Sequence, residues 1–189
     1  VIGIDFVSRE KQEARAAETA EKGSVTWHGL IESMEDFERY PWPDVRDADY
    51  ESIEYVNDSL PEGMGFLVSS HQGPFALCAN AFFGIQNLSY FSVDKPDLLR
   101  AVFDRLSDIK YRFMEQVIGL PNVLGIWAHD DMGHKTSTMV SPDFLKEYVL
   151  GHHRKMAELA HAHGKIYALH SCGNVYELMD ELIDDVGID

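Results

Sequence analysis

The sequence predicts an α/β protein in which helices cover a parallel sheet. Short apolar segments at about 65–70, 123–128 and 165–169 have the length and composition of buried strands. A segment with helical periodicity or capping signals follows each of them. Strands that alternate with helices in this way form parallel sheets, because the helix carries the chain back to the edge where the strand began.

Each predicted helix has its own signals. Pro74 can begin a helix through "FALCANAFFGI", and Pro96 begins one that ends before Gly119 and Pro121. In this second helix apolar residues at 99, 102, 106, 109, 113 and 117 keep the three-or-four spacing of an amphipathic helix. Ser141-Pro142-Asp143 supplies an N-cap, a first-turn proline and an acidic first turn for a helix that lasts until Gly164.

The last predicted helix runs from an Asn174 cap through Asp185, and "VGID" after it is typical of the approach to another strand. Residues 1–63 are less regular, with a helix expected at 9–21 and with Pro41 and Pro43 interrupting any helix around Trp42. We therefore predict a helical or irregular segment or lid at 1–63 and β/α units at 64–189. Trp42 is expected to anchor the first part to the second.

Composition excludes several classes of function. The formal charge is −16 and the Lys and Arg residues are scattered, which argues against nucleic acid and anionic membranes as partners. No apolar run is long enough for a membrane helix and the first residues lack a signal-peptide pattern, so the sequence predicts a cytoplasmic protein. Two cysteines cannot supply a disulfide framework. No glycine-rich phosphate loop is present.

The main candidate site lies at the end of the segment 165–169. Side chains alternate along a strand, so His170 and Cys172 share a face and can converge. Carboxyl ends of parallel strands carry the functional sites of α/β folds, and zinc accepts both imidazole nitrogen and cysteine sulfur. A metal pair is one interpretation of "HSC". A hydrogen-bonded histidine beside a buried thiol is the other.

Further candidates follow the two earlier strands. Asp130 and Asp131 are adjacent, so only one of the two carboxylates can face a site, where it would act on substrate or orient a ligand histidine. His129 or His134 could supply another ligand, and His71 also follows a strand. His152 falls on the apolar face of its helix and Cys78 on that of another, so both are interpreted as packing residues.

Several motifs together resemble the uroporphyrinogen decarboxylase superfamily, which includes cobalamin-dependent methyltransferases. They are "YPWPDV", "SSHQGPFALCANAFFG", "IWAHDDMGHKTSTMVSPDFLKEYV" and "AHAHGKIYALHSCGN…LIDDVGID". The resemblance implies a (β/α)8 TIM barrel of which this chain is a part, with the C-terminal strands missing, because a barrel usually takes about 250 residues. A flavodoxin-like sheet is the compact alternative. Open strand edges would favour a homodimer or another partner that covers them.

The resemblance also separates two branches. The tyrosine and serine of the decarboxylase branch correspond here to Asn80 and Asp130, and an "RQAGR" type segment is absent, so porphyrinogen decarboxylation is disfavoured. In the methyltransferase branch an H-x-C pair and a later cysteine bind zinc. His170 and Cys172 match the pair, and the third ligand is expected beyond Asp189.

The predicted function is therefore zinc-dependent methyl transfer between a small methyl donor or thiol and a corrinoid cofactor carried by a partner protein. Asp130 and Asp131 are the predicted catalytic residues, and His71 and Asn80 are predicted to bind substrate. Two alternatives stay open: a metal-free decarboxylase that uses the acidic pair, and a non-catalytic barrel that binds a ligand or a corrinoid protein.

Overall fold

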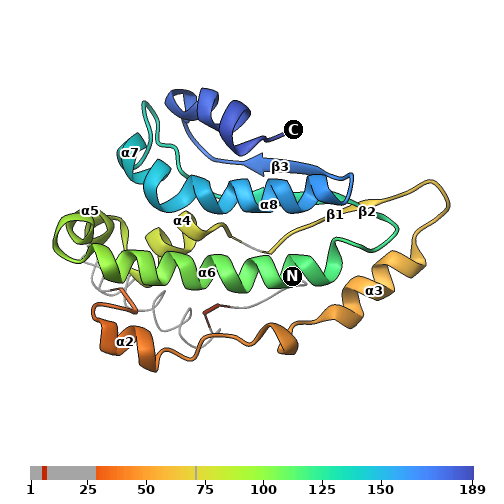
Figure 1. Ribbon diagram of the computed structural model, residues 1–189, viewed down its shortest axis with the longest axis horizontal. Helices are drawn as coiled ribbons and strands as arrows, with labels where there is room; N and C mark the ends of the chain where they lie inside the picture. The colour runs from red at the N-terminus through yellow and green to blue at the C-terminus, as the bar shows by residue number, and fades with distance from the viewer. Residues whose placement is uncertain (1–5, 8–28, 71) are drawn as a thin grey trace.

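A computed structural model describes residues 6–7, 29–70 and 72–189. Its sheet has three parallel strands in the order β1 (Phe66–Val68), β2 (Val123–His129) and β3 (Ile166–His170). The three strands lie within or overlap the three segments that the sequence predicts. In the described part of the chain, helices occupy the connections between them, as an α/β protein requires (Figure 1).

The predicted partial (β/α)8 barrel is wrong for this structure. The described residues form one open sheet of three strands, in which β1 and β3 are the two edges. A (β/α)8 barrel closes its sheet with eight tilted strands. Alternating strands and helices are common to barrels and open sheets, so the local pattern could not separate them.

The long amphipathic helix is confirmed as α6 (Pro96–Val117), which begins at its proline. Leu99, Val102 and Leu106 on its apolar stripe are fully buried. The helix predicted after Pro74 starts as α4 (Pro74–Leu77) and continues as a π-helix, η2 (Cys78–Phe82). A separate helix, α5 (Ile85–Asp94), precedes α6.

The helix predicted after Ser141 is also present, although it is not uniform. Ser141 Oγ accepts a hydrogen bond from the Phe144 N–H and so caps the first turn. The segment continues as α7 (Pro142–Leu145), the π-helix η3 (Lys146–Leu150) and α8 (Gly151–Ala162).

Helices α6 and α8 lie side by side and cover one face of the sheet (Figure 1). On this covered face Ile126 and Tyr167 are buried. On the opposite face Trp127 is 48% exposed and Ile166 is 45% exposed. Within the described residues, the helices thus enclose one side of the sheet and leave the other accessible.

The described residues before β1 form α2 (Met34–Arg39), the 3-10 helix η1 (Val45–Asp47) and α3 (Tyr50–Ser59). Trp42 stacks on Phe82 with ring centroids 5.3 Å apart and donates from Nε1 to the Phe37 carbonyl. This is the anchor that the sequence predicts. The helix expected at 9–21 lies outside the described residues, and the domain boundary at residue 63 stays a prediction.

After β3, Asn174 Oδ1 accepts a hydrogen bond from the Tyr176 N–H, but the N-cap position of the helix that follows is Val175, so the predicted Asn174 cap is wrong. The chain continues through the 3-10 helix η4 (Tyr176–Leu178) and the π-helix η5 (Glu181–Val186). Asp189 N–H then donates to the Tyr167 carbonyl of β3. None of the described helices has the length and apolar character needed to cross a membrane.

Candidate metal site at the strand ends

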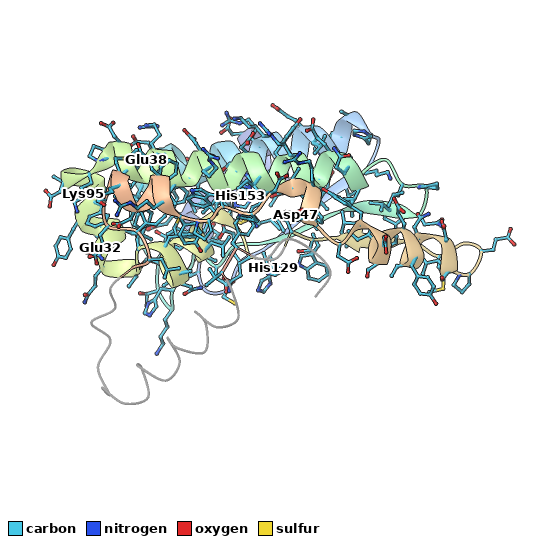
Figure 2. The ribbon with its side chains drawn as sticks, turned by 90° about the horizontal axis from the view of Figure 1, so that it is seen from below. Glu32, Glu38, Asp47, Lys95, His129 and His153 are labelled. Atoms are coloured by element: carbon cyan, nitrogen blue, oxygen red, sulfur yellow. The ribbon has the colours of Figure 1, made fainter. Side chains whose placement is uncertain are left out.

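The candidate site forms where β2 and β3 end together. His129 and His170 are register partners in the parallel pairing, so the two strands reach the same level before their loops begin. In Figure 2, His129 lies on the side of the sheet away from α6 and α8. The strand order therefore brings together two loops whose sequences, "DDMGH" and "SCGN", hold most of the predicted site residues.

Hydrogen bonds hold these two loops against each other from end to end. Five hydrogen bonds join one loop to the other: Asp130 N–H to His170 O (2.9 Å), Cys172 N–H to Asp131 Oδ1 (2.9 Å), Met132 N–H to Ser171 Oγ (2.9 Å), Gly133 N–H to Cys172 O (3.1 Å) and Asn174 N–H to His134 O (2.7 Å). The loops consequently form one continuous hydrogen-bonded unit.

Two glycines allow this close approach. A Cβ atom on Gly133 would lie 2.5 Å from the Cys172 carbonyl oxygen, and one on Gly173 would lie 2.4 Å from the Gly133 carbonyl carbon. Gly173 also has φ +78°, a conformation that favours glycine. These contacts explain why each loop carries a glycine where the two backbones meet.

Asp131, His170 and Cys172 meet at this junction. His170 Nε2 lies 3.4 Å from Cys172 Sγ and 3.7 Å from Asp131 Oδ1. The potential ligand atoms of all three residues lie within 4.8 Å of one another. This trio, which we call the strand-end cluster, contains a carboxylate, an imidazole and a thiol, a combination that zinc binds in proteins.

The electrostatics of the cluster connect Asp131 to Cys172. The hydrogen bond from the Cys172 N–H is the main reason why the pKa of Asp131 is lowered. The same carboxylate raises the pKa of the Cys172 thiol, because a hydrogen bond from the thiol to Asp131 and the nearby negative charge both favour the protonated sulfur. Without a cation, the cluster therefore holds a charged carboxylate beside a neutral thiol.

Asp130 points away from this cluster. Its carboxylate is fully buried and accepts hydrogen bonds from the Phe75 N–H (3.1 Å) and the Ala76 N–H (2.6 Å) at the start of α4. As the alternation predicts, only one of the two adjacent aspartates faces the site. Direct contact between Asp130 and a substrate would require this enclosed carboxylate to move, so its predicted catalytic role is not visible in the geometry.

Sequence reasoning missed the residues that complete the surroundings of Asp130. His153 Nε2 lies 3.0 Å from Asp130 Oδ2, and His153 Nδ1 lies 2.6 Å from the Tyr167 hydroxyl. In Figure 2, His153 lies inside the molecule. The signal in the sequence was Tyr167, because a tyrosine in the middle of a buried strand needs a partner for its hydroxyl.

Lys110 on α6 is a second buried polar residue that the sequence did not reveal. It is 1% exposed and donates from Nζ to the Ser70 carbonyl at 2.7 Å. Burial lowers the pKa of Lys110 to about 7, an effect that the Asp130 charge opposes. Its hydrogen bond holds the segment just after β1.

The other predicted residues lie outside the cluster. His71 is not among the described residues. Asn80 is exposed on η2, and none of the hydrogen bonds in the described part of the chain joins it to the cluster. His129 Nε2 lies 3.2 Å from Ser69 Oγ, and the exposed His134 contributes backbone hydrogen bonds.

Both residues interpreted as packing residues are buried. His152 is 8% exposed, and burial is the main reason why its pKa lies well below the ordinary value. Cys78 is fully buried, and the same cause raises its pKa. Burial in the core therefore accounts for both residues, and neither position requires a bound ligand to explain it.

Comparison with known proteins identifies no family. A scan against protein-family models found no match, and a search of curated proteins found none either.

Proposed function

We propose that Asp131, His170 and Cys172 bind a zinc ion, and that this site transfers a methyl group between a small methyl donor or thiol and a corrinoid cofactor on a partner protein. The observation that carries the proposal is the meeting of three potential ligand atoms within 4.8 Å at the ends of β2 and β3. Methyl transfer is favoured among zinc reactions by the resemblance of the H-x-C segment, and of the motifs around it, to corrinoid methyltransferases.

The two separations that join His170 to the other ligand atoms suit a tetrahedral zinc ion. With zinc bonds of about 2.0–2.3 Å, tetrahedral ligands lie roughly 3.4–3.6 Å apart. His170 Nε2 lies 3.4 Å from Cys172 Sγ and 3.7 Å from Asp131 Oδ1. Small rotations of exposed side chains would therefore accommodate the ion without movement of the strands.

Exposure of the cluster favours a reactive site over a structural one. The side chains of His170 and Asp131 are 51% and 47% exposed, and Cys172 is also exposed. Structural zinc usually has four protein ligands, whereas catalytic zinc has three and leaves a position for water or substrate. In the proposal Asp131 supplies the third ligand atom, in place of the cysteine that the resemblance leads us to expect beyond Asp189.

Zinc would supply one piece of chemistry here, the lowering of the pKa of a substrate thiol or the stabilisation of a leaving group. The residues of the chain would hold the substrate at the open side of the cluster. In transfer to a thiol, the sulfur loses its proton and bonds to the methyl carbon, while the cobalt–carbon bond breaks and leaves its electron pair on cobalt.

The geometry gives less support to metal-free decarboxylation by the acidic pair. That reaction requires both Asp130 and Asp131 at the substrate, but Asp130 is fully buried and already accepts backbone hydrogen bonds. Asp131 alone faces the accessible side. If the site binds zinc but does not accelerate methyl transfer, the protein is a non-catalytic binding protein.

Zinc analysis of the purified chain tests the metal site. We expect about one zinc per chain in the wild type and little in Cys172→Ala, Asp131→Ala or His170→Ala. His134→Ala is the matched control, because His134 is an exposed histidine of the same loop pair that lies outside the cluster. Equal zinc content in His134→Ala and His170→Ala, or none in the wild type after zinc is added, would contradict the proposal.

Methyl transfer is tested with methylcobalamin and a small thiol, following the absorbance change that accompanies loss of the cobalt–carbon bond. We expect the zinc-loaded wild type to accelerate it and the Cys172→Ala variant to leave the uncatalysed rate. If the protein binds zinc but does not accelerate methyl transfer to any of several thiols, it has a binding function and is not a methyltransferase.

A further inference from the structure

Asp130 is the most heavily hydrogen-bonded carboxylate near the proposed site, although it does not face it. Two backbone N–H groups of α4 and His153 Nε2 surround its two oxygens. Gly73, before α4, makes room for it, since a Cβ atom there would lie 2.2 Å from Asp130 Cγ. The carboxylate thus joins the start of α4, the end of β2 and the first turn of α8.

His153 connects this carboxylate to the edge strand β3. It is 1% exposed, and Tyr167 is fully buried on the covered face of β3. Burial is the main reason why the pKa of Tyr167 lies well above its ordinary value, so the hydroxyl keeps its proton and can donate to His153 Nδ1. His153 Nε2 then carries the hydrogen that Asp130 accepts, a tautomer assigned from the hydrogen-bond network.

The position of Asp131 follows from that of Asp130. Asp130 is held through its side chain by His153 and through its N–H by the His170 carbonyl. The next side chain emerges on the opposite face and places Asp131 Oδ1 2.9 Å from the Cys172 nitrogen. A shift of Asp130 would therefore move Asp131 within the cluster.

We propose that His153 is a positioning residue, which acts through Asp130 to hold the Asp131 carboxylate against Cys172. Stability alone is a weak reason for this arrangement, because well-packed apolar side chains often stabilise an interior as much as a buried polar network does. A network in which each polar atom has a partner instead defines one arrangement of the groups it joins. The described residues contain no buried side-chain nitrogen or oxygen without a partner.

Selective labelling with ¹⁵N-cysteine tests the proposal without any metal. The chain has two cysteines, so the amide spectrum holds two signals, one from Cys172 and one from Cys78. The Cys172 N–H reports directly on Asp131, to which it donates. Asp131→Ala assigns the signal and gives its position when that hydrogen bond is lost.

We expect His153→Leu to move the Cys172 signal toward its position in Asp131→Ala. His153→Gln should restore most of the wild-type position, because its amide can still donate to Asp130. His152→Leu is the matched control, since His152 is the neighbouring buried histidine on α8 and makes no hydrogen bond to Asp130. If His153→Leu leaves the signal where His152→Leu leaves it, the proposal is wrong.

Tyr167→Phe provides a second variant in case His153→Leu does not fold. It removes only the hydroxyl that holds His153 Nδ1. We expect a smaller displacement of the Cys172 signal in the same direction, and an unchanged signal in this folded variant would overturn the proposal.

The inference rests on the proposed function only for its consequence in metal binding. There we expect His153→Leu to weaken zinc binding by about tenfold relative to His152→Leu, the low end of the effect of residues that orient metal ligands. A wild type that binds no zinc would refute the proposed function and leave the spectroscopic result to decide the role of His153. Equal zinc affinities in folded His153→Leu and His152→Leu would refute the positioning role while the metal site stands.

Discussion

The backbone N–H of Cys172 donates a hydrogen bond to Asp131 Oδ1 across 2.9 Å, and so joins the loop after β3 to the loop after β2. The same carboxylate raises the pKa of the Cys172 thiol, while its own pKa is lowered. One residue thus determines both where the thiol lies and how readily it loses its proton.

Zinc affinity should increase with pH. Zinc binds the thiolate form of cysteine, and Asp131 holds the thiol pKa above its ordinary value of 9.0. Between about pH 7 and about pH 8.5, zinc binding must therefore release the Cys172 proton. We expect the affinity to rise by about tenfold per pH unit, measured by competition with a chromophoric chelator. An affinity independent of pH over this range would show that Cys172 is not a ligand.

Gly133→Ala should separate the two loops. Its Cβ atom would lie 2.5 Å from the Cys172 carbonyl oxygen, and backbone atoms cannot rotate away as a flexible side chain can. We expect a loss of roughly 1–3 kcal/mol in the free energy of unfolding and weaker zinc binding. Urea denaturation and zinc titration measure the two effects.

Gly151→Ala is the control for this change. Gly151 begins α8 and a Cβ atom there meets nothing within 4 Å, so alanine should preserve or slightly increase stability. Equal changes in stability in the two variants would mean that the effect of Gly133→Ala does not come from separation of the loops.

Lys110→Met should change how stability depends on pH. Burial lowers the pKa of Lys110 from 10.5 to about 7, so the unfolded chain binds the proton more tightly than the folded protein does. In the wild type this residue therefore makes the free energy of unfolding rise between about pH 7 and about pH 10.5. Below pH 7 the buried Lys110 lowers the free energy of unfolding by its full amount. We expect Lys110→Met to remove this rise, a change of up to about 4 kcal/mol across the window.

Urea denaturation at several pH values measures this difference, and Lys155→Met, at an exposed position on α8, is the control. Parallel stability curves for the wild type and Lys110→Met between pH 7 and 9 would contradict the prediction.

Trp42→Ala should destabilise the protein as a whole. Its ring stacks on Phe82 and lies 4.8 Å from the ring of Tyr40. Truncation of an anchor of this kind lowers the free energy of unfolding by about 2–4 kcal/mol. Truncation of a lid residue would instead alter ligand binding with little effect on stability. Thermal unfolding of Trp42→Ala beside Trp42→Phe distinguishes the two, and an unchanged melting temperature in Trp42→Ala would favour the lid.

The helices and strands could be predicted where local patterns are strong. Pro96 and the apolar spacing that follows it determine α6, and Ser141 with Pro142 determines the start of α7. The π-helices η2 and η3 could not be predicted, because residues compatible with an α-helix occupy both of them. Closure of the sheet could not be predicted either, since it depends on how strands distant in sequence pair.

The candidate site was predicted in part. Alternation along a strand placed His170 and Cys172 on one face and showed that only one of Asp130 and Asp131 could face a site. It could not say which aspartate did, because that depends on the direction in which β2 ends. His153 was missed because its partners, Asp130 and Tyr167, come from two other elements.

The sequence by itself therefore determined the order of the elements, the pair His170 and Cys172, and the location of both at a strand end, because these follow from periodicity and short-range geometry. Only the tertiary structure decided that the sheet is open, that Asp131 joins the pair, and that Asp130 is buried against α4 and His153. The physical reason is that each of these depends on contacts between residues far apart in the chain, which exist only once β2, β3 and α8 have packed together.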